Sequence, residues 1–349
     1  MRKKEVTFKE ISEYTGFSKT TVSRYFNDPD SLTLENQQKI ADALEVLGYK
    51  ENKVARMLAS GKTEFIGVIV PNLFLNYYSE ILNKLLSTYE KYGYKFLVFA
   101  GNEQPETERK YISELLAYKI EGMIILSHTI SSEELASYGV PVVSIEREDK
   151  YICSVNSDNF NGGEQAAQML SDCGCDVLIH INSDVPPEIP AHKRITGFKE
   201  FCRQNNIANE VLLVDWSGVF SENVVKTEET INYLDEKYPD KRKGIFLSND
   251  NTAANFLNCL VRKHSCLPDD YRMVGFDNSS VSAEAIIPIS TIEQQIDKIA
   301  GEAMEILVMQ MNEQKKRRPV PLKEPVHKIV PTVAIPRDTT KNREITKQK

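Results

Sequence analysis

The pattern of apolar and polar positions changes at about residue 62. From Glu64 onward, short continuous apolar runs alternate with longer segments in which apolar residues recur every three or four positions. Continuous runs are typical of strands buried on both faces, and the recurring pattern is typical of helices with one buried face. We therefore expect strands at 65–71, 95–100, 122–126, 140–145, 177–182, 211–214, 244–248, 272–276 and 326–330, and helices at 77–92, 106–119, 192–204, 222–237, 251–264 and 296–311, with a further helix running from Gly162-Gly163 to Cys173.

This alternation predicts two α/β units, each a parallel sheet covered by helices. Two such units side by side leave a cleft at the carboxyl ends of their strands, where ligands bind in folds of this class. In the helix at 77–92 we expect an inward face made of Ile81, Leu82, Leu85, Leu86 and Tyr89.

The first fifty residues instead predict three short helices. Phe8, Ile11 and Ser12 fall at helical spacing, and the break that follows contains Gly16, which can adopt a positive φ angle. Ser18 can cap a second helix that points Val22 inward and Lys19, Thr20, Thr21, Ser23 and Arg24 outward. A third helix, capped by Thr33, runs to about Leu47. The spacing of the first two is that of a helix-turn-helix, in which the second helix enters the DNA major groove.

Residues 52–62 form a short helix-prone segment with an Asn at its start and a Gly near its end. A helix this short is marginal in water on its own. The segment is either a plain connector or a hinge that becomes helical only when it is supported.

The distribution of charge supports a chain that meets DNA at one end only. The formal net charge is −7, but residues 1–62 hold 11 Lys and Arg against 9 Asp and Glu, and the remaining residues hold 32 against 41. A mildly basic N-terminal part on an acidic body fits this arrangement.

Cysteine usage and hydropathy predict a cytoplasmic protein. The chain has neither a secretory signal nor an apolar stretch long enough for a membrane span. The six cysteines are scattered, and Cys173-Gly-Cys175 is the only close pair. We interpret them as reduced thiols and expect no metal site and no cofactor.

An α/β enzyme is one competing class, and its motifs are missing. The sequence has no Gly-x-Gly-x-x-Gly after a strand, no phosphate-binding loop and no Gly-x-Ser-x-Gly, and its five histidines are isolated from one another. A solute-binding receptor without DNA function is a second alternative, which leaves the N-terminal helices unexplained.

The motifs taken together resemble the LacI/GalR family of bacterial transcription regulators over nearly the whole chain. The matching segments are Ser18-Lys-Thr-Thr-Val-Ser-Arg24 with Asn27, Gly48-Tyr49, Asn52 with Val54-Ala55-Arg56 and Leu58, Ile66-Gly-Val-Ile-Val-Pro71, Glu121-Gly-Met-Ile-Ile125, Asp158-Asn159 with Gly162-Gly163, Arg194 with Gly197-Phe198, Asn249-Asp250 and Val274-Gly-Phe-Asp277. Such a likeness implies an all-α helix-turn-helix headpiece followed by a periplasmic-binding-protein-like core of two doubly wound parallel-sheet subdomains.

The resemblance also implies the domain boundaries. They are a DNA-binding domain at 1–50, a hinge helix at 51–62, an N-subdomain at 63–163 and 292–324, a C-subdomain at 164–291 and 325–338, and a flexible tail at 339–349.

The resemblance assigns the DNA-binding residues. Lys19 and Thr20 would read base edges in the major groove, where Lys reaches guanine and Thr covers a thymine methyl group or bonds a base. The groups that position phosphates without reading sequence would be Thr7, Ser18, Ser23, Arg24 and Asn27. In the hinge, Asn52, Ala55 and Leu58 are carried over, with Leu58 as the wedge in the minor groove. Two hinges must pair, which implies a homodimer on a near-palindromic double-stranded operator.

The resemblance further implies a small-molecule effector, a sugar or sugar derivative, in the cleft. The residues carried over are Tyr77, Tyr78, Asp158, Arg194, Trp216, Asn249 and Asp277. Their carboxylates, guanidinium and amide suit a polyhydroxylated ligand. The segment from Asn72 to Tyr78 departs from the family pattern, Trp216 is nearly as well explained by a structural role, and Glu51 replaces a proline before the hinge. We expect a repressor of a carbohydrate-utilisation operon, with a purine, nucleoside or sugar-phosphate co-repressor as the alternative effector.

Overall fold

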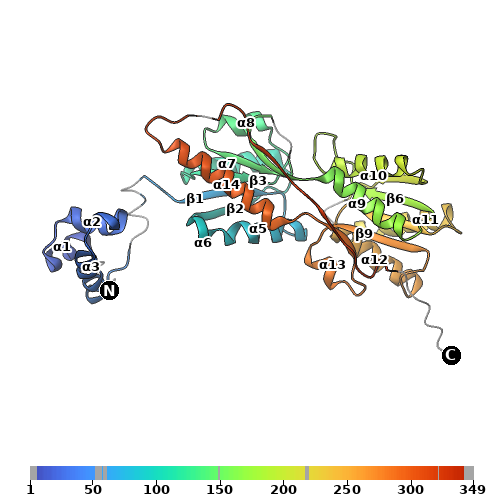
Figure 1. The fold of residues 1–349 in the computed structure, drawn as a ribbon, viewed down its shortest axis with the longest axis horizontal. Coiled ribbons are helices and arrows are strands. Elements are labelled where there is room, and N and C mark those ends of the chain that lie inside the picture. The colour runs from blue at the N-terminus through green and yellow to red at the C-terminus, as the bar shows by residue number, and fades with distance from the viewer. Residues whose placement is uncertain are drawn as a thin grey trace. The chain divides into compact units, whose positions relative to one another are not determined.

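The computed structural model describes residues 6–51, 57, 61–147, 150–216, 220–320 and 322–341. The chain forms two compact units, Met1–Lys62 and Thr63–Lys349. Figure 1 shows the first unit in dark blue and the second in the colours from light blue to red. The predicted hinge residues Asn52, Ala55 and Leu58 lie outside the described residues, as does the tail from residue 342.

The first unit contains the three predicted helices. They are α1 (Phe8–Thr15), α2 (Lys19–Asn27) and α3 (Leu34–Leu47), with a short 3-10 helix, η1 (Pro29–Ser31), between the last two. Ile11, Val22, Ile40 and Ala43 are buried where the helices meet. The rings of Phe8 and Phe26 stack at 5.2 Å and close the other side of this small core.

The turn between α1 and α2 follows the predicted chemistry. Gly16 has a φ angle of 75°, and the Ser12 hydroxyl donates to the carbonyl of Phe17 at 2.5 Å. Ser18 caps α2, because its Oγ accepts the backbone N–H of Thr21 at 3.1 Å. These local bonds fix the angle at which α2 leaves α1.

The second unit contains two six-stranded sheets, as the alternating pattern predicted. The first has the order β11-β5-β4-β3-β1-β2 and the second the order β12-β10-β9-β8-β6-β7. All neighbouring strands are parallel except β10 and β12, which are antiparallel. This is the doubly wound arrangement expected for the two subdomains.

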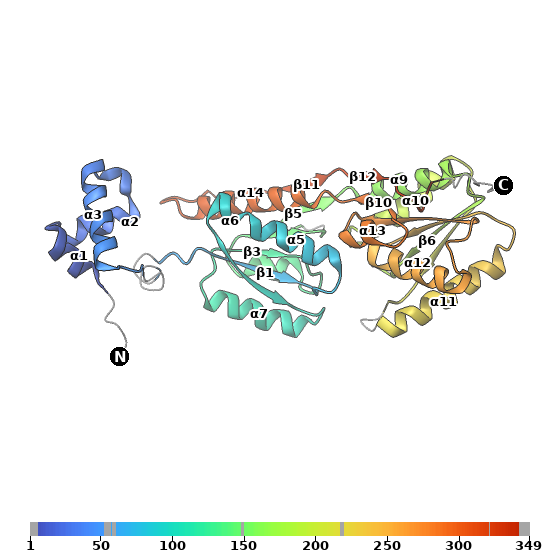
Figure 2. The same ribbon diagram turned by 90° about the horizontal axis from the view of Figure 1, so that it is seen from below.

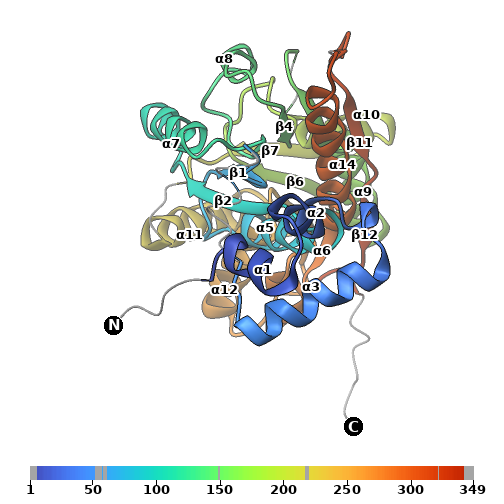
Figure 3. The same cartoon turned by 90° about the vertical axis from the view of Figure 1, so that its left-hand side faces the viewer.

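The first subdomain carries helices on both faces of its sheet. Figure 2 shows α5, α6 and α14 on one face and α7 on the other, and Figure 3 shows α7 and α14 on opposite sides of the strands. Its elements are β1 (Phe65–Val70), α5 (Asn76–Ser87), α6 (Tyr89–Tyr92), β2 (Lys95–Ala100), α7 (Pro105–Ala117), β3 (Gly122–Ile125), α8 (Ser132–Ser137), β4 (Val142–Ile145), β5 (Cys153–Ser157), α14 (Ile296–Gln314) and β11 (His327–Val330).

The second subdomain repeats this plan. Helices α9 and α10 cover one face of the sheet, and α11 and α12 cover the other (Figure 2). Its elements are α9 (Asn159–Asp172), β6 (Val177–Asn182), α10 (His192–Gln204), β7 (Asn209–Leu213), α11 (Phe220–Lys237), β8 (Lys243–Leu247), α12 (Asp250–His264), β9 (Tyr271–Asp277), α13 (Ser280–Glu284), β10 (Ser290–Glu293) and β12 (Val333–Ile335).

The chain crosses between the subdomains after β5, after β10 and after β11. The last crossing differs from the predicted boundary, which placed all of 325–338 in the C-subdomain. Strand β11 pairs with β5 of the first sheet, and only β12 joins the second sheet. The predicted tail also starts later, because Thr339 is fully buried and its Oγ1 donates to the carbonyl of Met273 at 2.7 Å.

The predicted helix at 77–92 is broken into α5 and α6. The break lies at Thr88, whose Oγ1 donates to the carbonyl of Leu85 at 2.6 Å. Leu86 and Tyr89 are 41% and 46% exposed, so their predicted inward position was wrong. Ile81, Leu82 and Leu85 are buried as predicted.

The glycines at 162 and 163 lie inside α9, which begins at Asn159 rather than after them. A Cβ atom on Gly163 would lie 2.2 Å from the carbonyl oxygen of Arg194, and one on Gly197 would lie 2.0 Å from that of Phe160. These glycines therefore allow α9 and α10 to cross closely, which is a packing role and not a helix break.

Within the part of the chain that the structure describes, no helix combines the length and the apolar character needed to cross a lipid bilayer. All six cysteines carry free thiols.

Candidate functional site

The exposed start of α2 forms the first candidate site. Lys19, Thr20 and Arg24 are exposed, and their side chains make no hydrogen bond or ion pair with another described residue. Ser18 precedes them as the helix cap. A lysine and a threonine at the first turn of such a helix can reach base edges when the helix lies in a major groove.

The other predicted phosphate-positioning groups are exposed or half-buried near the ends of α1 and α2. The backbone N–H of Thr7 donates to Oε2 of Glu10 at 2.7 Å, and its hydroxyl donates to the same oxygen at 3.0 Å. At the end of α2, Nδ2 of Asn27 donates to the carbonyl and hydroxyl oxygens of Ser23 at 3.0 and 3.1 Å. These contacts order the two helix ends around the exposed face of α2.

The second candidate site is a polar cluster at the carboxyl ends of the strands in the second unit. We call it the central cluster, and its members are Tyr77, Tyr78, Glu146, Asn159, Arg194, Asp277 and Gln294. The cluster draws on both subdomains: Tyr77 and Tyr78 come from α5, Glu146 follows β4 and Asp277 ends β9.

Arg194 of α10 is held in place by other elements of the second subdomain. It is buried, and its Nε donates to Oδ1 of Asn159 at 2.7 Å while Nη1 donates to the carbonyl of Ser248 at 2.7 Å. The guanidinium lies over the ring of Phe276, with 3.6 Å from Cζ to the ring centre. Stacking and two bonds hold the orientation of this cation.

Glu146 continues the same chain of hydrogen bonds. Its Oε2 accepts from Nδ2 of Asn159 at 2.8 Å, and its Oε1 accepts from the backbone N–H of Ser157 at 2.5 Å. Asn159 therefore joins the guanidinium of Arg194 to the carboxylate of Glu146 from the first turn of α9.

A second chain of bonds runs through the crossover after β10. The Ser157 hydroxyl donates to Oε1 of Gln294 at 2.7 Å, and Nε2 of Gln294 donates to Oδ1 of Asp277 at 2.5 Å. Burial raises the pKa of Asp277 well above its usual range, and the negative charge of the nearby Asp250 raises it further. Asp277 thus lies where negative charge is already unfavourable.

Tyr77 and Tyr78 cover the cluster from α5. Their rings meet edge to face at 5.4 Å, and the Tyr77 hydroxyl is buried without a hydrogen-bond partner among the described residues. The pKa of Tyr77 is raised mainly by burial, then by the charges of Glu146 and Asp277, and the charge of Arg194 lowers it. The buried hydroxyl therefore lies within reach of the charges of all three groups.

Comparison with known proteins identifies this architecture. Residues 2–47 match a helix-turn-helix family model, residues 63–234 match the model described as periplasmic binding proteins and sugar binding domain of LacI family, and residues 167–340 match a periplasmic binding protein-like domain. The sucrose operon repressor of Streptococcus mutans is 30% identical over 306 residues, which cover 87% of this chain and 92% of that protein. The chain belongs to the LacI family of transcriptional regulators.

Other comparisons extend over nearly the whole chain. The ribose operon repressor of Halalkalibacterium halodurans is 27% identical over 340 residues, covering 97% of this chain and 98% of that protein. The crystal structure of the lac repressor dimer bound to operator and an anti-inducer matches with a TM-score of 0.77 and 22% identity, covering 97% of this chain and 99% of that one. The predicted fold class is confirmed. As a LacI-family member, the chain is a DNA-binding regulator and not an enzyme.

The structure of this LacI-family chain brings together four of the seven predicted effector residues: Tyr77, Tyr78, Arg194 and Asp277. Asp158 and Asn249 instead cap helices, because their side-chain oxygens accept the N–H groups of Asn161 at 3.1 Å and Thr252 at 2.8 Å. The ring of Trp216 packs against the core of the second subdomain. For these three residues a ligand contact stays a prediction.

Sequence reasoning missed Glu146, Asn159 and Gln294. Glu146 directly follows a strand that the sequence did predict, and this position at the carboxyl end was a usable signal. Gln294 follows β10, which was itself missed, and Asn159 was read only as part of a motif.

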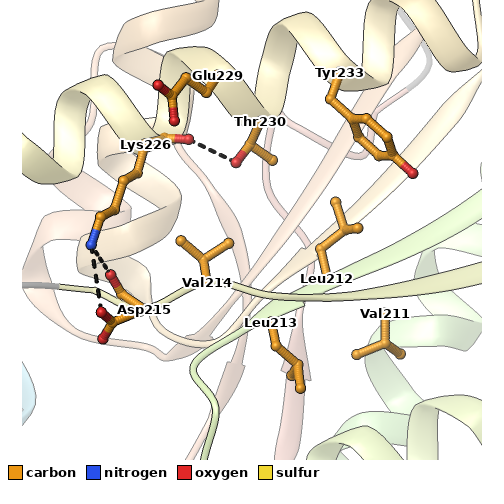
Figure 4. Close-up of a pocket in the computed structure, with 9 residues that line it drawn as sticks. All are labelled: Val211, Leu212, Leu213, Val214, Asp215, Lys226, Glu229, Thr230 and Tyr233. Carbon is orange, nitrogen blue, oxygen red and sulfur yellow. Dashed lines mark hydrogen bonds and ion pairs between the residues drawn. The ribbon is translucent and has the colours of Figure 1, made fainter.

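A groove of about 480 Å³ lies elsewhere, along β7 and α11 (Figure 4). Its lining includes Val211, Leu213 and Tyr233, and an ion pair of 3.8 Å between Lys226 and Asp215 lies at one end. None of the predicted effector residues lines it.

Proposed function

We propose that this LacI-family chain represses a carbohydrate-utilisation operon, binding a near-palindromic operator as a homodimer under the control of a small carbohydrate effector. The observation that carries the DNA-binding part is the exposure of Lys19 and Thr20 at the first turn of α2, where their side chains have no bond to another described residue. The printed names of the sucrose and ribose operon repressors support the carbohydrate part.

On the operator, Lys19 and Thr20 read base edges, and the surrounding polar groups position the sugar-phosphate backbone. The positioning groups are Thr7, Ser18, Ser23, Arg24 and Asn27. Two copies of the chain place two such helices in successive major grooves, about one helical turn of DNA apart. The hinge at 51–62 then orders between them, and Leu58 wedges into the minor groove, supported there by Asn52 and Ala55.

The effector site is the central cluster together with the remaining predicted residues, Asp158, Trp216 and Asn249. Its bonds cross from the first subdomain to the second, from Glu146 through Asn159 to Arg194 and from Ser157 through Gln294 to Asp277. A ligand held by both subdomains changes how the two subdomains meet. We propose that this change shifts the equilibrium of the hinge between an ordered helix and a frayed segment.

A gel-shift titration of the full chain against salt tests the DNA-binding proposal. A specific binder should show log K falling linearly with log salt, with a slope of roughly 0.9 for each phosphate contact. A flat response without preference for an inverted-repeat operator would rule the proposal out. Sedimentation of the chain with and without operator tests the homodimer.

A thermal-shift screen of carbohydrates tests the effector proposal. A ligand present at a hundred times its dissociation constant adds about 2.7 kcal/mol to the free energy of unfolding. A ligand that stabilises the chain and also changes operator affinity supports the proposal, and a screen in which stabilising ligands leave operator affinity unchanged contradicts it.

A further inference from the structure

We propose that a basic loop of the second unit binds the phosphate backbone of the same DNA that the first unit reads. The loop consists of Lys315, Lys316, Arg317 and Arg318, directly after α14, and we call it the basic loop. This inference goes beyond the proposed function, which places every DNA contact in the first unit and the hinge. It rests on the DNA binding of the first unit.

The basic loop lies at the end of the second unit where the chain enters from the hinge. Nζ of Lys315 pairs with Oε2 of Glu121 at 2.5 Å, and Oε1 of Glu121 accepts the backbone N–H of Glu64 at 2.8 Å. Glu64 directly precedes β1, the first strand after the hinge. Figures 1 and 2 show the loop after α14 and the start of β1 at the same end of this unit. DNA that holds the hinge therefore approaches the second unit from this end.

The basic loop is an exception in an acidic unit. From residue 63 onward, 41 Asp and Glu face 32 Lys and Arg, yet positions 315–318 are four consecutive cations. Lys315 is paired with Glu121, and Lys316 is paired with Glu313. Arg317 and Arg318 are exposed, and their side chains make no hydrogen bond or ion pair with another described residue. Two guanidinium groups are thus left for an external anion.

A further cation lies at the same end of the unit. The carbonyl of Lys119 accepts the hydroxyl of Thr63 at 2.6 Å, so Lys119 lies beside the residue at which the second unit begins. Its side chain is exposed and has no bond to another described residue. Unpaired positive charge therefore comes from two separate segments around the point where the hinge joins.

Contacts within the protein hold the basic loop before it meets a partner. Lys315 also donates to the hydroxyl of Tyr94 at 3.0 Å, and the N–H of Val320 donates to Oε1 of Glu313 at 2.9 Å. The loop is thus fastened on both sides of the two arginines. A loop that is already ordered loses less conformational entropy when it binds.

Double-stranded DNA fits this surface. It carries one negative charge for about every 1.7 Å of its axis, and a guanidinium can bond two oxygens of one phosphate. Contacts of this kind position a protein without reading bases. The basic loop should therefore add affinity that is independent of sequence and depends on salt.

The first experiment compares two double variants of the full chain by gel shift over a range of salt concentrations. The probes are a duplex that carries the inverted repeat selected by the chain from a random pool, and a duplex of the same length without that repeat. Arg317→Gln with Arg318→Gln should weaken binding to both duplexes at least about tenfold near physiological salt. Each phosphate contact contributes roughly 0.9 to the slope of log K against log salt, so the slope should fall by about 2–4 for a homodimer.

Lys241→Gln with Arg262→Gln is the matched control, because it removes the same charge from exposed positions of the second subdomain. Lys241 precedes β8, and Arg262 lies in the last turn of α12. We expect this control to change affinity less than about twofold and to keep the slope. If the two double variants lower affinity and slope equally, the inference is overturned, and the basic loop is left for an acidic protein surface. Thermal unfolding should be alike for both, since none of the four side chains is buried.

The second experiment removes the charge from the DNA instead. Single phosphates of the selected duplex are replaced by uncharged methylphosphonates, one position at a time. At some positions the replacement should weaken binding of the original chain severalfold and leave binding of the Arg317→Gln, Arg318→Gln variant unchanged, because the two changes remove the same contact. If every replacement weakens both proteins by the same factor, the arginines do not meet the backbone.

The outcomes separate this inference from the proposed function. A chain that selects no inverted repeat contradicts the proposed function, but the inference stands if the duplex without a repeat is bound less tightly by the arginine variant than by the control. A chain that selects a repeat and whose two double variants behave alike contradicts only this inference. A chain that binds no duplex contradicts both.

Discussion

Asn76 and Asn251 bond to each other across the two subdomains. The backbone N–H of Asn76 donates to Oδ1 of Asn251 at 3.1 Å, and Nδ2 of Asn251 donates to Oδ1 of Asn76 at 2.9 Å. Nearby, the N–H of Ser280 donates to Oε1 of Glu80 at 2.8 Å. Helix α5 of the first subdomain is therefore tied to α12 and α13 of the second, in addition to the three chain crossings.

Breaking this pair should weaken effector binding. The bonds favour the arrangement in which both subdomains meet, and a ligand that contacts both subdomains binds less tightly when that arrangement is less populated. Loss of a net hydrogen bond worth about 1 kcal/mol predicts roughly fivefold weaker binding for Asn76→Ala, measured by calorimetry.

A double-mutant cycle supplies the control for that measurement. Asn76→Ala, Asn251→Ala and the double variant should be non-additive, because each single change already removes the side-chain bond from Nδ2 of Asn251 to Oδ1 of Asn76. Additive effects on affinity would show that the two residues do not act together.

Lys19→Ala should reduce operator affinity and relax base preference. We expect a loss of roughly 1–3 kcal/mol on the cognate operator and a smaller loss on operators altered at the contacted base. Arg24→Ala should weaken binding to all operator sequences alike, because a phosphate contact carries no information about the bases. Gel shifts on a set of single-base operator variants measure the affinity and the base preference of both protein variants.

Lys39→Ala is the matched charge control for these variants. Lys39 lies on α3, exposed and paired with Glu35 at 2.8 Å, so removing it changes the net charge without touching α2. If Lys19→Ala and Lys39→Ala reduce the affinity for every operator variant by the same factor, Lys19 acts only through overall charge and does not read bases.

The regular part of the fold could be predicted because apolar side chains fill its core. The strand Val177–Asn182 and the helix His192–Gln204 match the prediction to the residue. Strands β5 and β10 were missed because buried serine and threonine residues interrupt their apolar pattern. Thr291 of β10 is fully buried, and its Oγ1 donates to Oδ1 of Asp250 at 2.6 Å. Such a strand is stable because its hydroxyls are satisfied, which hydropathy cannot reveal.

The central cluster could be predicted only in part for a similar reason. Arg194 and Asp277 belong to motifs that the sequence displays, and the structure places them together with the tyrosines. Asn159 and Gln294 reach the cluster through the crossovers after β5 and β10, so their positions depend on how the two sheets are connected. Asp158 and Asn159 are adjacent at the start of α9, and only the backbone direction decides that Asn159 bonds Glu146 while Asp158 caps the helix.

The close crossing of α9 and α10 gives a prediction for stability. Gly163→Ala should lower the free energy of unfolding by about 1–3 kcal/mol or more, because the new Cβ atom would meet the Arg194 backbone at 2.2 Å. Gly301→Ala is the matched control, since Gly301 lies within α14 and a Cβ atom there meets nothing within 4 Å. Gly301→Ala should raise the free energy of unfolding by about 0.4–1 kcal/mol. Urea unfolding measures the free energy of unfolding of both variants. Equal changes in Gly163→Ala and Gly301→Ala would contradict the packing role of Gly163.

His180 makes stability depend on pH in a predictable direction. Burial lowers its pKa to about 3 from the usual 6.5, and the charges of Arg194 and Lys199 act in the same direction. The ring stacks on Phe246 at 4.2 Å, and Nδ1 donates to the carbonyl of Phe246 at 3.0 Å, which fixes a neutral tautomer. Below pH 6.5 the unfolded chain binds a proton here that the folded chain does not, so stability is lost as the pH falls from 6.5 towards 3.

Comparison of the chain with His180→Leu at pH 7 and pH 5 isolates this effect. Between these two values the original chain should lose about 1–2 kcal/mol more of its free energy of unfolding than the variant, because one proton contributes about 1.36 kcal/mol per pH unit below its unfolded pKa. Only the difference between the two pH values matters, so any loss of packing in the variant cancels. If both chains lose the same free energy, His180 takes up its proton in the folded state, and the neutral, buried assignment is wrong.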